Sequence, residues 1–221
     1  MEAQAPAHLQ HVRLLPSCTN FANVFGPDFF VVETFGKGSC FFHALANALF
    51  EGYDWESSKE RREEAGIALR RSFLQATNEE MYTQTISKVA SRLSKLALKY
   101  PNTPKLRDVP PYAVFRDKLG TASTWADLVI ISFIAHQFNL NLMFWNELAC
   151  AFYFGVDQLD KASTCNNFPT IFINWRNRSH FELIVRVDQK NNVVERQFFP
   201  QRDPNLFTRV RQAYYKNVLI D

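Results

Sequence analysis

The feature that most constrains this chain is a glycine-rich turn that leads directly into an apolar run, at residues 36–50. Gly36 and Gly38 stand one residue apart, and glycine adopts backbone conformations that other residues disfavour. Ser39 follows, and serine is a residue type that caps helices. Apolar residues then recur at helical spacing. We therefore predict a tight turn followed by a buried helix with Cys40 in its first turn.

This position favours a reactive thiol at Cys40. The N-terminus of a helix carries the positive end of the helix dipole, which lowers the pKa of a thiol and favours the nucleophilic thiolate. The same turn can direct backbone N–H groups at a developing oxyanion. The alternative is an ordinary buried cysteine on a core helix, so the interpretation depends on partners elsewhere in the chain.

Composition indicates a globular protein in a reducing environment. The chain has 221 residues, of which 47% are hydrophobic, enough for one domain with a substantial core. A formal net charge of +3 is too small to indicate nucleic acid, which we do not expect as a partner. The cysteines form no C-x-x-C pair, residues 1–15 contain no apolar run of signal-peptide length, and polar residues interrupt the longest apolar stretch. We expect a monomer in the cytoplasm, or in a host cytosol or nucleus, without membrane contact.

Periodicity along the chain predicts an α+β fold, with a small mixed β-sheet packed by helices and a helical lobe inserted after the Cys40 helix. Capping-box patterns indicate helices that open near Ser57, Thr77 and Thr124. The remaining expected elements are buried strands at 29–35 and 170–174, half-buried strands at 140–145 and 180–187, their partners at 151–154 and 193–199, and a helix at 205–217.

The same reading divides the chain into three parts. Residues 1–28 are expected to form an irregular arm that lies on the domain. Residues 29–200 are expected to form the catalytic domain, in which the helical lobe covers about 57–120. Residues 201–221 are expected to form a C-terminal helix that packs on the domain.

A nucleophilic cysteine needs a base, and His180 is the candidate. It stands where a polar turn enters a strand, far downstream of Cys40, an arrangement that cysteine proteases use. Glu182 lies two residues on, so the two side chains share a strand face at a separation of about 6.6 Å. A carboxylate there can accept a hydrogen bond from the imidazole and fix its tautomer. The alternatives are a strand-end histidine with a structural role and a solvated glutamate.

Three blocks of the sequence together resemble the ovarian-tumour (OTU) family of cysteine proteases. FGKGSCFFHA at 35–44 resembles the nucleophile motif of that family, usually Gly-Asp-Gly-Asn-Cys-Leu-Phe-Arg-Ala. TWAD at 124–127, with the segment to Trp145, resembles its second block, and IFIN at 171–174 with SHFE at 179–182 resembles its His block. The blocks span roughly residues 29–187. The resemblance implies a papain-like fold of the OTU type in a divergent member, of viral or bacterial-effector character.

The resemblance also implies an activity and a site. The activity is that of a deubiquitinase, a cysteine isopeptidase that hydrolyses the bond after the C-terminal glycine of ubiquitin or a ubiquitin-like modifier, with polyubiquitin as a partner. By position, Cys40 is the nucleophile, His180 the general base and Glu182 the orienting residue. The oxyanion-hole loop comprises Lys37, Gly38 and Ser39.

The sequence departs from the family pattern at several positions. Lys37 replaces the aspartate that supports the oxyanion loop, although a backbone hole survives if the loop keeps its shape. His43 replaces an arginine, and Asp28 and Glu33 are alternative orienting groups. Lys37 favours one alternative function, a catalytically weak module that binds ubiquitin or another partner. A protease that processes its own polyprotein is the other.

No metal or cofactor is expected. His8 and His11 have ligand-like spacing, but no cysteine or carboxylate cluster completes a site around them. Several further residues are expected to be structural, namely Cys18, Cys150 and Cys165 as core or loop thiols, and Trp125 and Trp145 as core side chains.

Overall fold

The computed structural model of the protein describes residues 12–13, 19–35, 37–50, 53, 57–99, 106, 109–156, 168–177, 179–188, 190 and 193–219. Several residues considered above lie outside this set, namely His8, His11, Cys18, Gly36 and Cys165. The proposed division into arm, catalytic domain and C-terminal helix stays a prediction.

The described residues form helices and strands in alternating groups. The helices are α1 (Thr19–Phe25), α2 (Cys40–Leu49), α3 (Lys59–Gln75), α4 (Glu79–Lys99), α5 (Tyr112–Gly120), α6 (Leu128–Gln137) and α7 (Pro204–Leu219). The strands are β1 (Val12–Arg13), β2 (Phe29–Val32), β3 (Asn141–Asn146), β4 (Ala151–Val156), β5 (Thr170–Arg176), β6 (His180–Asp188) and β7 (Val193–Glu195).

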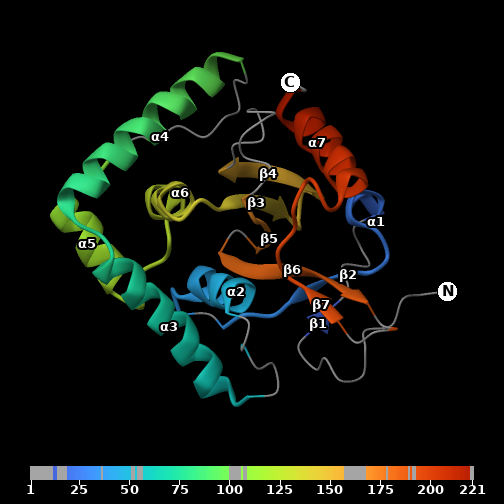
Figure 1. Ribbon diagram of the computed structural model, residues 1–221, viewed down its shortest axis with the longest axis horizontal. Helices are drawn as coiled ribbons and strands as arrows, with labels where there is room; N and C mark the ends of the chain where they lie inside the picture. Colours follow the sequence, from blue (N-terminus) through green and yellow to red (C-terminus); the bar gives the residue numbers. More distant parts are fainter. Residues whose placement is uncertain are drawn as a thin grey trace.

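The strands form one mixed sheet in the order β1-β2-β6-β5-β3-β4, with β7 also paired to β6 (Figure 1). β3 and β5 run parallel, and the other pairs are antiparallel. The fold is therefore α+β, as predicted, with helices α3 to α6 inserted between the β2–α2 unit and the rest of the sheet. The expected pairing of the strand near 151–154 with the strand before it is confirmed.

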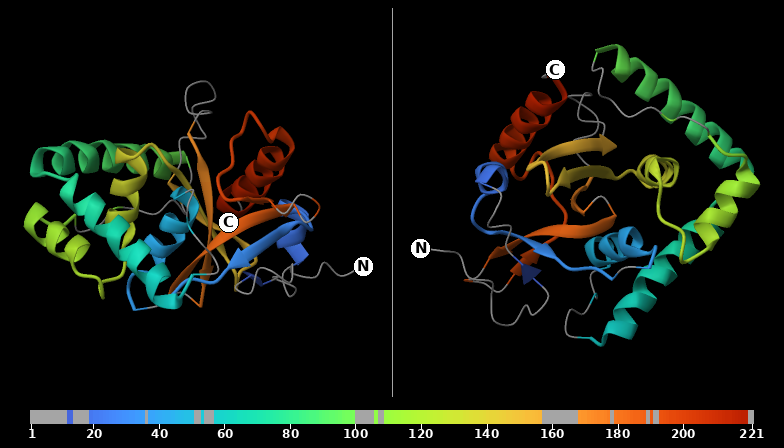
Figure 2. Two further views of the ribbon diagram at one scale, coloured as in Figure 1. Left: turned by 60° about the horizontal axis from the view of Figure 1, so that its bottom comes forward. Right: turned by 180° about the vertical axis from the view of Figure 1, so that it is seen from behind.

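Helices cover both faces of the sheet. In Figure 1, α2 and α6 lie against one side, α3, α5 and α4 form an outer arc beyond them, and α1 and α7 lie on the other side; Figure 2 shows the same layers from below and from behind. Side chains along β6 alternate between the two cores, because Leu183 and Val185 pack with α2 while Ile184 packs with α1 and α7. This alternation fixes which β6 side chains face the Cys40 helix.

The helix caps differ from the predicted ones. Three helices begin with a side-chain oxygen that accepts a backbone N–H three residues later, which is the geometry of an N-cap. The caps are Ser58 (from Arg61 N, 3.4 Å), Asn78 (from Met81 N, 2.9 Å) and Asp127 (from Ile130 N, 3.0 Å), rather than Ser57, Thr77 and Thr124. Thr77 instead donates to the carbonyl of Phe73, so its hydroxyl belongs to the end of α3.

Other expectations need correction as well. The arm predicted to be irregular contains α1, whose Phe21 and Phe25 pack into the core with Trp145. β3 was predicted to be half-buried, but it is buried on both faces because helices cover both sides of the sheet. Trp145 is in the core as predicted, whereas Trp125 is 45% exposed. Cys150 is disulfide-bonded rather than a thiol. No helix in the described part of the chain is long and apolar enough to cross a membrane.

Candidate active site

Cys40 is the first residue of α2 and is only 1% exposed. Ser39 precedes it but does not cap the helix, because its hydroxyl donates to the carbonyl of Ala122 at 2.8 Å. The backbone N–H groups at the start of α2 are therefore not used by a side-chain cap. Such groups, at the positive end of a helix, suit a negatively charged ligand or intermediate.

The turn before Cys40 has the left-handed backbone that the glycine pattern predicted. Lys37 has φ +66° and Gly38 has φ +88°. A Cβ at Gly38 would lie 2.2 Å from the carbonyl oxygen of Ser123, so the turn packs directly against the segment between α5 and α6. The Lys37 side chain is exposed. The shape of the loop thus depends on Gly38, while Lys37 adopts a conformation that costs a non-glycine residue about 1 kcal/mol.

His180 opens β6, and its ring is held by Thr34, which follows β2. The pairing of Val32 with Leu183 brings Thr34 opposite Phe181, next to His180. His180 Nε2 lies 3.1 Å from the Thr34 carbonyl oxygen and 3.2 Å from Thr34 Oγ1, and Oγ1 donates to the carbonyl of Phe181. Because a carbonyl oxygen only accepts, Nε2 carries the proton. Nδ1 is then the nitrogen that can accept a proton from a thiol.

Cys40 lies close to the start of β6, where the backbone N–H of Phe181 interacts with its sulfur. Among the described residues, the hydrogen bonds of the His180 ring go to Thr34 and none joins it to Cys40. Burial raises the pKa of the Cys40 thiol, and the charge of Glu182 acts in the same direction, against the N–H groups of Phe181, Phe41 and Cys40 itself. The predicted lowering of this pKa is therefore wrong for the free protein, because desolvation exceeds the effect of the helix N-terminus.

Glu182 is fully buried within a polar group on the strand face that His180 shares. It accepts hydrogen bonds from Asn174 Nδ2 at 2.9 Å and from Arg176 Nη1 at 3.4 Å. The same Asn174 nitrogen also donates to Glu147 at 2.7 Å. Both hydrogen bonds of the His180 ring go to Thr34, so this conformation offers Thr34 as an orienting residue. The role of Glu182 in orienting His180 stays a prediction.

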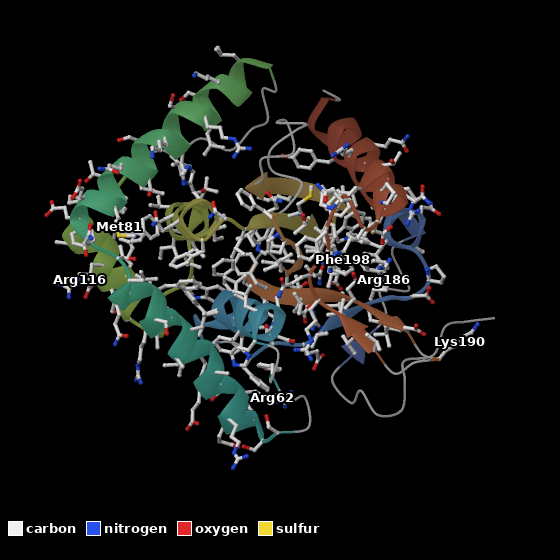
Figure 3. All side chains as sticks on the ribbon, viewed as in Figure 1. Arg62, Met81, Arg116, Arg186, Lys190 and Phe198 are labelled. Atoms are coloured by element: carbon white, nitrogen blue, oxygen red, sulfur yellow. The ribbon has the colours of Figure 1, made fainter. Side chains whose placement is uncertain are left out.

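Two buried side chains, His43 and Arg62, contact Phe35, directly before the Cys40 turn. The rings of Phe35 and His43 meet edge to face with centroids 4.9 Å apart, and the Arg62 guanidinium lies over the Phe35 ring at 4.7 Å. Figure 3 labels Arg62 on α3. Burial lowers the pKa of His43 to about 4, and the charges of Arg62 and His180 add to this effect. His43 is therefore neutral at neutral pH, and its position within α2 does not make it the base.

Sequence reasoning missed two residues next to this site, Thr34 and Arg70. Thr34 carries no motif of its own and is recognised only from the β2–β6 register. Arg70 is 2% exposed and hydrogen-bonds Ser39 Oγ at 3.4 Å. One signal was available for Arg70, because it shares the buried face of α3 with Gly66, Leu69 and Phe73 at helical spacing.

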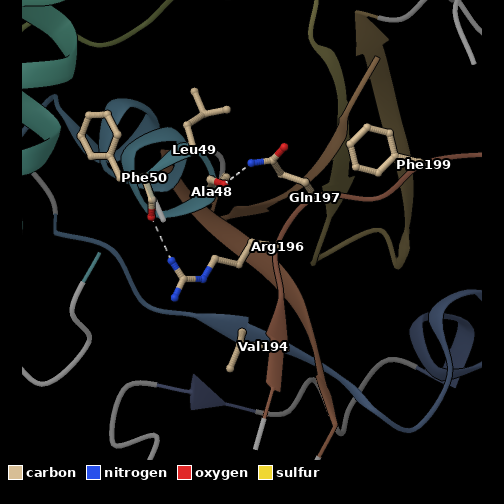
Figure 4. Close-up of a pocket in the computed structure, with 7 residues that line it drawn as sticks. All are labelled: Ala48, Leu49, Phe50, Val194, Arg196, Gln197 and Phe199. Atoms are coloured by element: carbon tan, nitrogen blue, oxygen red, sulfur yellow. Dashed lines mark hydrogen bonds between the residues drawn. The ribbon is translucent and has the colours of Figure 1, made fainter. Parts of the chain in front are cut away.

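A separate hollow of about 380 Å³ lies at the far end of the Cys40 helix (Figure 4). Arg196 donates to the carbonyls of Asn47 and Phe50, and Gln197 donates to the carbonyl of Ala48, so both residues satisfy the C-terminal carbonyls of α2. The lining residues are Ala48, Leu49, Phe50, Val194, Arg196, Gln197 and Phe199. This hollow is thus distinct from the Cys40 site, which lies at the N-terminus of the same helix.

Comparison with known proteins gives matches to solved structures only. No protein-family model matches the chain, and no curated protein does. The chain is similar to the Hazara virus OTU bound to ubiquitin (12% identity, 73% of this chain and 83% of that chain, TM-score 0.43). It is also similar to an OTU domain in complex with ubiquitin (15% identity, 84% of this chain and 84% of that chain, TM-score 0.42). A third similar structure is the viral OTU domain protease from Farallon virus (14% identity, 75% of this chain and 96% of that chain, TM-score 0.37). Each of these structures is an OTU domain, the family that the three sequence blocks resemble.

Proposed function

We propose that this protein is a cysteine isopeptidase that removes ubiquitin or a ubiquitin-like modifier. The observation that carries the proposal is the meeting of Cys40, in the first turn of a buried helix, with the start of β6, where Thr34 leaves Nδ1 of His180 as the proton acceptor. The three OTU-like sequence blocks support the choice of substrate. No metal ion or cofactor takes part in the reaction.

The reaction follows from these groups. Nδ1 of His180 takes the proton of Cys40 as the sulfur attacks the carbonyl of the substrate's C-terminal glycine. Backbone N–H groups of the Lys37–Cys40 loop stabilise the oxyanion. The imidazolium then donates its proton to the departing lysine amine, and a water activated by His180 hydrolyses the thioester. Because burial keeps the free thiol protonated, proton transfer accompanies the attack rather than preceding it.

The decisive experiment is reaction with ubiquitin that carries a thiol-reactive electrophile at its C-terminus. The wild type should form an adduct of the summed mass, Cys40→Ala should form none, and His180→Ala should react at least about 100-fold more slowly, since general base catalysis contributes roughly 100-fold or more. Arg116→Ala, at an exposed position on α5, is the control and should react like the wild type. No adduct from folded wild-type protein would refute the proposal.

A matched pair of variants decides which residue orients His180. Thr34→Val removes the hydroxyl at Nε2 and keeps the branched shape, and Glu182→Gln removes the buried charge and keeps the size. The backbone carbonyl of residue 34 remains in Thr34→Val, so this variant tests the contact of the hydroxyl with the ring. If the Thr34 hydroxyl holds the ring in place, Thr34→Val should lower kcat by about tenfold and Glu182→Gln by less than threefold. The opposite ranking of steady-state kcat values would assign the role to Glu182.

One specific observation favours a second function, a module that binds ubiquitin with little turnover. The Cys40 pKa is raised, and His180 is not hydrogen-bonded to the thiol in this conformation. Binding of unmodified ubiquitin that is equal in the wild type and in Cys40→Ala, without an adduct from the electrophile, would establish this function instead.

A further inference from the structure

Arg70 occupies an unusual position for a charged residue. It lies on α3, inside the helical lobe, and its side chain is almost completely buried. Its guanidinium stacks over the Phe42 ring at 4.6 Å. Burial lowers the pKa of Arg70 to about 10. Placing a guanidinium here costs desolvation energy, so its contacts should show what compensates for it.

Among the described residues, the hydrogen-bond partners of Arg70 are all neutral oxygen atoms. Nη2 donates to the carbonyl of Lys118 at 2.6 Å and Nε donates to that of Leu119 at 2.7 Å, both in the last turn of α5. Nη1 donates to the carbonyl of Ala122 at 3.1 Å and to Ser39 Oγ at 3.4 Å. A cation is favourable at the C-terminus of a helix, where the carbonyls carry partial negative charge.

These hydrogen bonds join the loop before Cys40 to the turn between α5 and α6, two segments that are distant in sequence. Ser39 Oγ donates to the Ala122 carbonyl, so Arg70, Ser39 and Ala122 form a closed set of three hydrogen bonds. Gly38 packs against Ser123 beside this set. The planar guanidinium can reach all four acceptors at once, which a lysine ammonium cannot. The loop that precedes Cys40 is therefore fastened to the turn between α5 and α6 by the Ser39 hydroxyl, and the Arg70 guanidinium binds both partners of that hydrogen bond.

We infer that Arg70 is a positioning residue for the nucleophile: it holds Ser39 on the α5–α6 turn and so fixes the backbone N–H groups beside the Cys40 sulfur. It touches neither the substrate nor the reacting atoms. Through Arg70 on α3, the helical lobe thereby contributes to the reaction, although Cys40 and His180 both lie outside the lobe. The effect on turnover rests on the function proposed above, but the effect on the thiol does not.

The test compares two Arg70 variants with a control variant, and Ser39→Ala is measured beside them. Arg70→Met removes the donors and keeps most of the volume, Arg70→Lys keeps the charge, and Arg71→Met alters the exposed neighbour on the same helix as a control. Three measurements are made on each variant, and the two kinetic ones are made below the melting temperature of every variant. They are the melting temperature itself, the rate of Cys40 alkylation by iodoacetamide as a function of pH, and kcat and KM for cleavage of ubiquitin from a fluorescent leaving group.

If Arg70 positions the loop, Arg70→Met should shift the midpoint of the alkylation profile upward, because the N–H groups that stabilise the thiolate lose their alignment. Turnover by Arg70→Met should fall about 10- to 100-fold in kcat with KM within about twofold, as expected for interactions made in the transition state. Arg70→Lys should recover part of kcat, and Arg71→Met should match the wild type. Ser39→Ala should raise the alkylation midpoint and lower kcat as well, but by smaller amounts than Arg70→Met. If Arg70→Met does not fold, Ser39→Ala serves as the test.

Two results would overturn the inference. One is a lower melting temperature in Arg70→Met with an unchanged alkylation midpoint and unchanged kcat, which would make Arg70 a purely structural residue. The other result applies if Arg70→Met does not fold. It is a Ser39→Ala variant whose alkylation midpoint and kcat both equal those of the wild type. If the wild type does not cleave ubiquitin but the alkylation midpoint shifts as expected, the positioning role holds and the proposed function fails.

Discussion

At the residue scale, Gly38 is the position where one added carbon should do most damage. Its φ of +88° is unfavourable for a side chain, and a Cβ would lie 2.2 Å from a backbone oxygen of Ser123, which cannot rotate away. Gly38→Ala should therefore lower the free energy of unfolding by about 2–4 kcal/mol and abolish adduct formation. Chemical denaturation and the ubiquitin electrophile measure the two effects.

Gly26 provides the matched control for this substitution. It also has a positive φ, +106°, but within the described part of the chain no heavy atom beyond its two sequence neighbours lies within 4 Å of the position a Cβ would take. Gly26→Ala should cost only the backbone strain, about 1 kcal/mol, and leave adduct formation unchanged. Equal losses of stability in the two variants would show that the Ser123 contact does not constrain the loop.

The raised pKa of Cys40 gives a prediction on pH. A thiol in a preformed ion pair with imidazole reacts at a rate that levels off near neutral pH. Here the pKa lies above its ordinary value, so the thiolate fraction should keep rising beyond about pH 8.5, the usual midpoint of a free thiol. The alkylation rate of the free protein should follow this rise, and a plateau below pH 7 would contradict it.

At the element scale, the crossing of α2 and α3 depends on Gly66. A Cβ there would lie 2.7 Å from Cδ2 of His43 and 3.2 Å from its backbone N and Cα. Alanine normally stabilises a helix by up to about 1 kcal/mol relative to glycine, but here α3 would have to move away from the helix that carries Cys40. Gly66→Ala should therefore reduce stability by about 1–3 kcal/mol in chemical denaturation.

Gly120, the last residue of α5, is the control for the α2–α3 crossing. Its Cβ would meet only the flexible end of Leu74 at 3.4 Å. Gly120→Ala should change the free energy of unfolding by less than about 0.5 kcal/mol. If Gly66→Ala proved as harmless as Gly120→Ala, the two helices would not be in close contact at this point.

The elements also show what the sequence could and could not predict. The Cys40 helix, the β5 and β6 strands and the α+β class follow from apolar periodicity and glycine placement. α1 was missed because prolines surround it, and its two core phenylalanines lie in a short segment. α3 was predicted, but its buried face includes Arg62 and Arg70, whose charge favours solvent although their helical spacing places them on that face. Which face a helix turns inward depends on partners that a single segment does not contain.

In the candidate site, too, some residues could be predicted from the sequence and others could not. Cys40 and His180 are recognisable because each lies beside a local signal, a glycine turn and a polar strand entry. The position of Thr34 beside His180 depends on the register of β2 against β6. The contacts of Arg70 depend on the C-terminal end of α5, a helix that the sequence did not predict. Contacts between distant segments thus give these residues roles that no local motif identifies.

At the scale of the whole molecule, one core connects the lobe to the sheet. It runs from Phe73, Tyr82 and Phe115 in the lobe, through α2, to Leu183 on β6. The lobe should therefore not unfold on its own. Native-state hydrogen exchange should give similar opening free energies for peptides from α3, α5 and β6. Exchange of the α3 and α5 peptides at a free energy several kcal/mol lower would show an independent unit.

The pairing of β2 with β6 has a consequence for synthesis of the protein on the ribosome. The register that joins Phe30 to Val185 brings together two strands that are far apart in the sequence. Chains that are still being translated contain the thiol long before they contain the imidazole or the strand that carries it. Long-range pairing of this kind forms late. In the proposed mechanism, Cys40 therefore has no base until the chain up to His180 has left the exit tunnel, and shorter chains should be inactive.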